Sequence, residues 1–122
     1  IEYIAGSHLW GKDFKPQRFD GTDLFQGDTA EAVPDMATRR DEFDVVGWAV
    51  EPGDAVAFNF RTLHGAPANA SPHRRRVISM RWVGDDAVFS QRLGTTSPAF
   101  PDLDYTPGTP FDAPEFPVLY RA

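Results

Sequence analysis

The sequence predicts an all-β protein with short antiparallel strands and long loops. Eleven Pro and ten Gly among the 122 residues favour turns and disfavour long helices. In the middle of the chain, large apolar residues alternate with small or polar ones, which is the period of a strand with one buried face. The strands predicted in this way are too few to close a barrel by themselves.

The first segment, residues 1–42, is predicted to be rich in loops. Glycines recur along it, and aromatic residues such as Trp10 and Phe14 lie between them as anchors. Loops of this length are uncommon in compact domains and are often functional. Within this segment, residues 34–42 are compatible with a short helical turn and equally with a loop.

The core strands are expected within residues 43–83. The first of them covers residues 43–50, which form a run of β-favouring residues. A type II turn is predicted directly after it, at residues 51–54, because Pro52 presets φ at the second turn position and Gly53 accepts a positive φ at the third.

Two further strands follow this turn, at residues 55–64 and 74–83. In the earlier one, period-two parity places His64 on the same face as three large apolar residues, Val56, Phe58 and Phe60. In the later one, Arg75 shares its face with Val77, Ser79 and Arg81, and the opposite face carries Ile78, Met80 and Trp82. We therefore expect the strand at 55–64 to be buried along its apolar face, and we expect at least one of the arginines at 74–76 to point inward.

The last segment, residues 84–122, is predicted to be a Pro-rich, extended tail. Its large apolar residues are expected to anchor it to the folded body: Phe100, Leu103, Tyr105, Phe111, Phe116, Val118 and Tyr120. The three segments, 1–42, 43–83 and 84–122, are expected to belong to a single domain.

The composition excludes several classes of function. A formal net charge of −6 argues against binding to nucleic acid or to an anionic membrane, since both require surplus positive charge. The absence of Cys excludes disulfides, zinc–thiolate sites and Cys nucleophiles. We see neither a membrane-spanning apolar run nor a signal-peptide pattern, and the simplest prediction is a cytoplasmic protein.

His64 and Arg75 are the two residues on which a chemical prediction can be built. A single His at the end of a strand is more often a structural residue than a metal ligand. Arg75 follows eleven residues later on the next predicted strand, and pairing of the two strands would bring both side chains toward one end of one face. An Arg binds a carboxylate through two parallel hydrogen bonds and remains charged at any working pH. The alternative is that residues 74–76 form a solvated run of charge.

Several motifs along the chain together resemble the phytanoyl-CoA dioxygenase (PhyH) family. The most specific is the stretch from His64-Gly65-Ala66 through Arg74-Arg75-Arg76-Val77-Ile78-Ser79 to Arg81-Trp82. Gly6-Ser7-His8 is similar to a turn that in this family follows the first half of the barrel, and Pro52-Gly53-Asp54 is similar to one of its hairpins. The combination and its order are specific, whereas each motif alone would be weak.

The resemblance implies a fold, a chemistry and a set of site residues. The fold would be a double-stranded β-helix, a jelly-roll relative of the cupins. The chemistry would be that of an Fe(II)/2-oxoglutarate dioxygenase, which couples oxidation of 2-oxoglutarate by dioxygen to hydroxylation of a small organic molecule or an acyl thioester. His64 would be an iron ligand and Arg75 would bind the far carboxylate of 2-oxoglutarate. Ser79 either lines the 2-oxoglutarate pocket or is a small residue of the barrel interior.

The sequence departs from the family pattern at the other two iron ligands. The resemblance implies that these come from an H-x-D or H-x-E motif before the turn at Gly6. The chain has three His, and the residues two positions after them are Trp10, Ala66 and Arg75, none of which is acidic. We therefore expect an N-terminal half of the same domain outside these residues, and we expect the chain alone to be inactive. The alternatives are a non-catalytic cupin-like binding module and a halogenase variant of the same fold.

Overall fold

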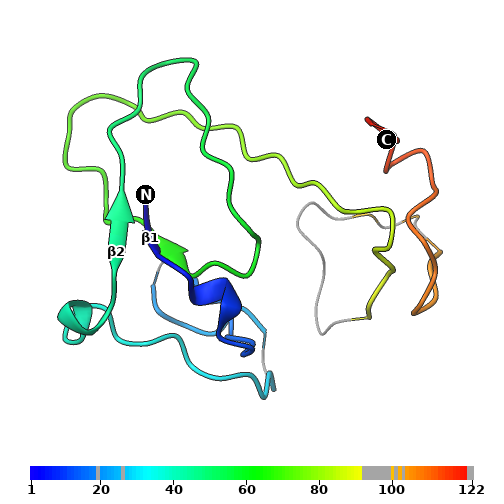
Figure 1. Cartoon of the computed structure of the whole chain (residues 1–122), viewed down its shortest axis with the longest axis horizontal. Helices are drawn as coiled ribbons and strands as arrows, with labels where there is room; N and C mark the ends of the chain where they lie inside the picture. The colour runs from blue at the N-terminus through cyan, green and yellow to red at the C-terminus, as the bar shows by residue number, and fades with distance from the viewer. Residues whose placement is uncertain (19, 26, 92–99, 101, 103, 121–122) are drawn as a thin grey trace. The chain divides into compact units, whose positions relative to one another are not determined.

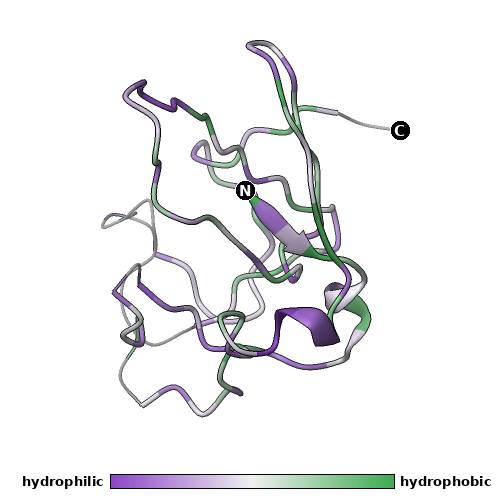
Figure 2. Ribbon diagram, turned by 90° about the vertical axis from the view of Figure 1, so that its left-hand side faces the viewer, coloured by the Kyte–Doolittle hydropathy of each residue, from purple (hydrophilic) through white to green (hydrophobic). Residues whose placement is uncertain are grey.

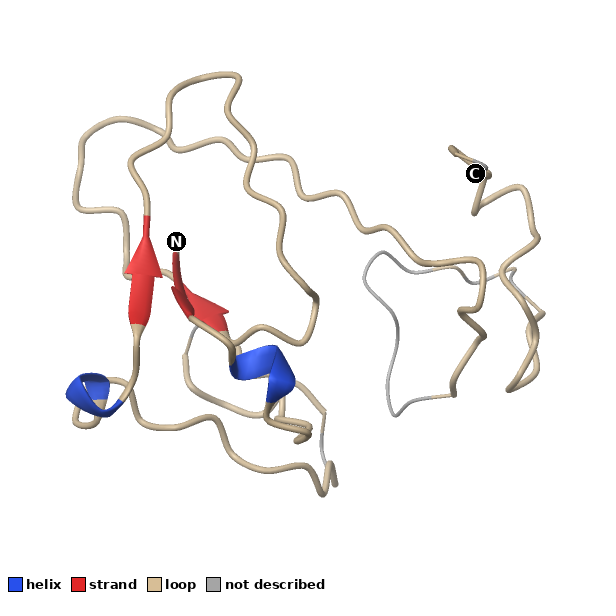
Figure 3. Cartoon of the chain, viewed as in Figure 1, coloured by secondary structure: helices blue, strands red, loops and turns tan. Residues whose placement is uncertain are grey.

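A computed structural model describes residues 1–18, 20–25, 27–91, 100, 102 and 104–120 (Figure 1). The chain divides into two compact units, Ile1–Arg75 and Arg76–Ala122. Regular secondary structure occurs in the first unit as strands β1 (Glu2–Ile4), β2 (Val45–Gly47) and β3 (His64–Gly65), with single 3-10 turns η1 (Ser7–Leu9) and η2 (Arg40–Glu42). Loops and turns make up most of the rest of the described chain (Figure 3). Among these residues, no helix has the length and apolar character needed to cross a membrane.

The sheet of the first unit has three strands in the order β2-β1-β3, all antiparallel. In the register, Tyr3 of the central strand lies opposite Val46 on one side and opposite His64 on the other. β1 falls within the segment that the sequence predicts to be loop, so that prediction is wrong at residues 2–4. Three residues are too few to show a period, and the pairing of β1 depends on partners more than 40 residues away.

The predicted core strands are found only in part. The strand at 43–50 is confirmed over Val45–Gly47. The strand at 55–64 is wrong except at its last residue, where β3 begins. The strand at 74–83 is wrong, because none of these residues is paired. The described residues place no neighbouring strand beside it, and a strand without a hydrogen-bonding neighbour gains nothing from its side-chain pattern.

The expected burial of the strand at 55–64 is also wrong in the described structure, and so is the expected inward-pointing arginine, because Arg74, Arg75 and Arg76 are all exposed. Phe60 is 81% exposed, and Ile78 is 86% exposed. The same holds for other members of the two alternating sets, namely Val56, Phe58, Met80 and Trp82. The alternation of large apolar with small or polar residues is therefore typical of a buried strand, but the described residues supply no layer that covers these side chains.

The turn predicted at residues 51–54 is confirmed. The amide of Asp54 donates to the carbonyl of Glu51 at 3.0 Å, and Gly53 has a φ of 105°, which only glycine adopts without strain. At residues 34–42, where the sequence left a short helical turn and a loop equally open, the structure has turn residues 36–38 followed by η2. Both turns depend on hydrogen bonds between residues that are close in sequence.

Tyr3 is the centre of the small core. It is 6% exposed, and its neighbour Ile4 is 5% exposed. The Tyr3 ring packs against three other rings, with centroid distances of 5.8 Å to Trp48, 4.8 Å to Phe58 and 6.0 Å to His64. Hydrophobic residues otherwise recur along strands and loops alike (Figure 2). The sheet thus depends on this aromatic cluster for its apolar contacts.

We predict that Tyr3→Ala abolishes the sheet. Truncating a large buried ring costs about 3 kcal/mol, and a sheet of three short strands has little stability beyond that. Amide hydrogen exchange should show loss of protection at Ile4 and Ala5, whose N–H groups bond to Leu63 and Asp44. Tyr105→Ala, in the second unit, is the matched control, and retention of protection in the Tyr3 variant would contradict this account of the core.

The second unit, described by itself, is organised around Tyr105. The Tyr105 hydroxyl accepts hydrogen bonds from the amides of Asp112 and Ala113, at 3.0 and 2.8 Å. Its ring packs against three others, those of Phe89, Phe111 and Phe116. Anchoring residues were predicted in this tail, and several of them contact one another; Val118 and Tyr120 are exposed, and Leu103 lies outside the described residues.

A bidentate ion pair fastens η2 to β1. The two guanidinium NH2 groups of Arg40 donate to the two carboxylate oxygens of Glu2 at 2.8 and 2.7 Å. These hydrogen bonds hold the pKa of Glu2 below its ordinary value. A lowered carboxylate pKa stabilises the folded state above the ordinary pKa, and the contribution is lost as the pH falls through the lowered one.

We therefore predict a small acid-dependent loosening at the edge of the sheet. As the pH is lowered through the glutamate range, the protection of the β1 amides relative to their intrinsic exchange rate should fall in the native chain. Glu2→Gln should remove this acid-dependent component, because no carboxylate remains to be protonated at that position. Glu115→Gln, a change in the other unit, serves as control, and an unchanged pH profile in the Glu2 variant would refute the assignment.

Candidate functional site

His64 begins β3, and the backbone just before it is fixed by the first residues of the chain. The carbonyl of Leu63 accepts from the amide of Ile4 at 2.9 Å, and the amide of Leu63 donates to the hydroxyl of Ser7 at 2.9 Å. Both polar backbone groups of Leu63 are therefore paired with the segment formed by β1 and η1. The position of His64 in the fold is set by residues that lie more than 50 positions away in the sequence.

The imidazole of His64 has one nitrogen engaged and one nitrogen open. Nδ1 lies 2.8 Å from the carbonyl oxygen of Thr62. A carbonyl oxygen only accepts, so Nδ1 carries the proton and the lone pair is on Nε2. Tyr3 and Phe58 pack against the ring, which remains exposed to solvent. Metal-binding His residues commonly donate their second N–H to a backbone carbonyl in this way, so the ring fits one ligand position of a metal site.

The complete ligand set of an iron centre is not present among the described residues. They contain no group of three His, Asp or Glu side chains arranged to hold a metal ion. His73 lies in an exposed loop, and His8 lies in η1 with a buried, unpartnered Nδ1. One imidazole alone does not hold Fe(II).

The described structure does not test the roles predicted for Arg75 and Ser79. Both side chains are exposed, Arg75 is the last residue of the first unit, and Ser79 belongs to the second. The pairing on which the approach of His64 and Arg75 depended is not seen in the described residues, since β3 pairs with β1 and residues 74–83 form no strand. The geometry is therefore compatible with His64 as a metal ligand through Nε2, and the roles of Arg75 and Ser79 stay predictions from the sequence.

The sequence analysis missed two residues that position His64. Ser7 and Thr62 are the buried polar residues of the described chain, at 2% and 9% exposure. The sequence marks Ser7 only as part of the family-like turn Gly6-Ser7-His8, and in the structure Gly6, with a φ of 72°, turns the chain out of β1. The role of Thr62 rests on its backbone carbonyl, which no side-chain pattern reveals.

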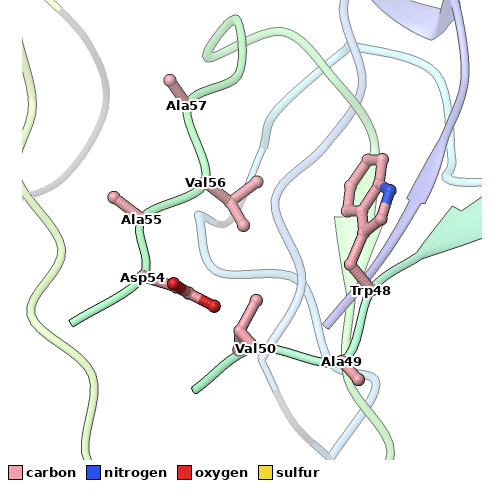
Figure 4. Close-up of a pocket in the computed structure, with 7 residues that line it drawn as sticks. All are labelled: Trp48, Ala49, Val50, Asp54, Ala55, Val56 and Ala57. Atoms are coloured by element: carbon pink, nitrogen blue, oxygen red, sulfur yellow. The ribbon is translucent and has the colours of Figure 1, made fainter. Parts of the chain in front are cut away.

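A shallow hollow lies between the two arms of the chain that flank the turn at 51–54. It has a volume of about 470 Å³ and is lined by Trp48, Ala49, Val50, Asp54, Ala55, Val56 and Ala57. Figure 4 shows Val50, Val56 and the Asp54 carboxylate directed toward the space between the arms. That carboxylate already accepts from the amide of Glu51, at 2.9 Å. The hollow includes none of the three predicted site residues.

Comparison with known proteins identifies the family. The family model of phytanoyl-CoA dioxygenase (PhyH) matches residues 1–77, and the chain therefore belongs to this family. The family is part of the Fe(II)/2-oxoglutarate-dependent oxygenase superfamily and has a cupin-like fold. His64 and Arg75 lie inside the matched range and Ser79 lies beyond it. Neither the curated proteins nor the solved structures contain a match to this chain.

Proposed function

We propose that this chain supplies the C-terminal part of an Fe(II)/2-oxoglutarate-dependent dioxygenase with a double-stranded β-helix (jelly-roll) fold. The substrate would be a small organic molecule or an acyl thioester, which the enzyme hydroxylates. The observation that carries the proposal is the state of His64. Its Nδ1–H is bound to the Thr62 carbonyl and its Nε2 lone pair is open, within the residues that match the family.

The proposal gives separate roles to the three predicted residues. His64 offers Nε2 as one ligand to Fe(II), and the bound iron supplies the oxidation with dioxygen and 2-oxoglutarate. Arg75 pairs with the far carboxylate of 2-oxoglutarate and orients it, because its planar guanidinium matches a carboxylate in two hydrogen bonds. Ser79 adjoins that pocket as a small residue with a hydroxyl.

The remaining iron ligands belong, in this proposal, to an N-terminal half of the domain that lies outside these 122 residues. The sequence has no H-x-D or H-x-E motif of its own, and the described residues contain no three-ligand cluster. The same half would provide strands to cover the exposed apolar residues of the segments 55–64 and 74–83.

The experiment is the release of succinate from 2-oxoglutarate. The intact protein, with both halves, is incubated with Fe(II), dioxygen and candidate substrates, and the 122-residue chain is assayed in parallel. We expect iron-dependent succinate from the intact protein and none from the chain alone. Iron-independent activity, or equal activity from the chain alone, would refute the proposal.

A non-catalytic binding module is the second candidate. The observation in its favour is that the described residues lack a three-ligand cluster. A module of this kind would bind a dicarboxylate through Arg75 without consuming it. Binding of 2-oxoglutarate by the intact protein, with no succinate formed in the presence of any substrate or iron, would favour it over the dioxygenase.

A further inference from the structure

We propose that Ser7 is a positioning residue for His64. Its hydroxyl fixes the backbone from which the imidazole extends, and this keeps Nδ1–H on the Thr62 carbonyl and the lone pair on Nε2. The use of that lone pair as an iron ligand rests on the proposed function, whereas the positioning itself does not. Ser7 would then contribute to the site without contacting the metal or the substrate.

The first step of the argument is that the Ser7 hydroxyl is used in full. The side chain is 2% exposed, so water does not compete for its hydrogen bonds. Oγ donates to the carbonyl of Ile4 at 2.7 Å and accepts from the amide of Leu63 at 2.9 Å. A hydroxyl has a single proton to donate. Because the Ser7 proton is directed at the Ile4 carbonyl, the lone pairs of Oγ are free to accept from the Leu63 amide. Ser7 therefore ties the end of β1 to the residue before His64.

The second step is that both polar backbone groups of Leu63, the N–H and the C=O, are hydrogen-bonded. Its amide is bound by Ser7 and its carbonyl by the amide of Ile4, at 2.9 Å in each case. Without the hydroxyl, the part-buried amide of Leu63 has no replacement acceptor in the described contacts, and a donor left unpaired away from water is unfavourable. The backbone would be expected to shift at Leu63 to reach water.

The third step leads from Leu63 to the imidazole. The acceptor of Nδ1–H is the carbonyl of Thr62, which forms one peptide group with the amide of Leu63. The hydrogen bond from that amide to Ser7 therefore sets the plane of the peptide, and with it the direction of the Thr62 carbonyl. Tyr3 and Phe58 pack against the ring, and these apolar contacts do not distinguish between its two nitrogens. Ser7 chooses the tautomer through the peptide plane.

The test uses the ¹⁵N-labelled chain and the ring nitrogen shifts of His64, recorded by NMR at about pH 8, on the alkaline side of neutral. In the native chain we expect the two separate shifts of an imidazole protonated at Nδ1. Ser7→Ala should move both shifts toward the average of the two tautomers and should accelerate exchange of the Leu63 amide. Ser7→Thr, which retains a hydroxyl, should restore both. Ser71→Ala, which removes an exposed hydroxyl, is the control.

The outcomes separate positioning from a merely structural role. Faster exchange at Leu63 with unchanged His64 shifts would overturn the proposal, since the hydroxyl would then hold the backbone without setting the tautomer. Loss of protection at Ala5, on the β2 side of the sheet, would overturn it as well, because Ser7 would then support the whole sheet. None of these readouts depends on iron or on turnover, so failure of the proposed function would leave them unaffected.

Discussion

His64→Ala in the intact protein is expected to abolish iron-dependent succinate release, with a loss of more than about 100-fold. Substituting a residue that only supports a metal ligand typically lowers metal affinity or activity by about 10–100-fold, and this substitution removes the ligand itself. The ring nitrogen that we expect to bind iron is Nε2. Nδ1 is committed to the Thr62 carbonyl, and Nε2 is the open donor of an exposed ring.

The measurement for this prediction pairs activity with metal content. The variant should lose both bound Fe(II) and turnover, and raising the iron concentration should recover turnover in part. His73→Ala is the matched control, because it removes an exposed imidazole from a loop of the same unit. Full activity in the His64 variant would show that the imidazole is not a ligand.

The contrast between local and distant interactions explains what the sequence can and cannot predict here. The turn at 51–54 and the turn within 34–42 depend on neighbours a few residues apart, so Pro52 and Gly53 are enough to predict the first. β1 depends on pairing with residues 45–47 and 64–65, and its own three residues show no pattern. Secondary structure of this kind becomes predictable only together with its partners.

The strand at 74–83 shows the converse error. Its alternation is clear, yet Ile78, Met80 and Trp82 are exposed and unpaired in the described structure. The alternation shows that these residues suit a sheet with one covered face. The described residues do not provide such a covering layer. This is why the same pattern supports the proposal of a further half of the domain.

The candidate site, like the fold, was predictable from the sequence only in part. His64 was identified from its parity and from the family motif, and the structure adds the bond that leaves Nε2 open. Ser7 and the Thr62 carbonyl were not identified, because their roles arise from a contact between the start of the chain and residues 62–64. Arg75 has no partner among the described contacts, so its role still depends on its match to the family.

Arg75→Ala is expected to weaken 2-oxoglutarate binding to the intact protein by about 10–100-fold and to leave iron binding nearly unchanged. A hydrogen-bonded charge pair contributes about 1.5–3 kcal/mol, and each 1.4 kcal/mol corresponds to a factor of ten in affinity. The prediction rests on a guanidinium that is exposed, has no ion pair in the described structure and lies inside the family match.

Substitutions in the same run of arginines provide the controls for Arg75. Arg75→Lys should restore only part of the affinity, because an ammonium group lacks the planar pair of donors. Arg74→Ala and Arg76→Ala remove the same charge from adjacent positions, and they should have much smaller effects if one guanidinium binds the carboxylate. Titration with 2-oxoglutarate at fixed iron measures all four variants. Equal losses across the run would mean that the arginines attract the dianion as a group, and that no single residue pairs with it.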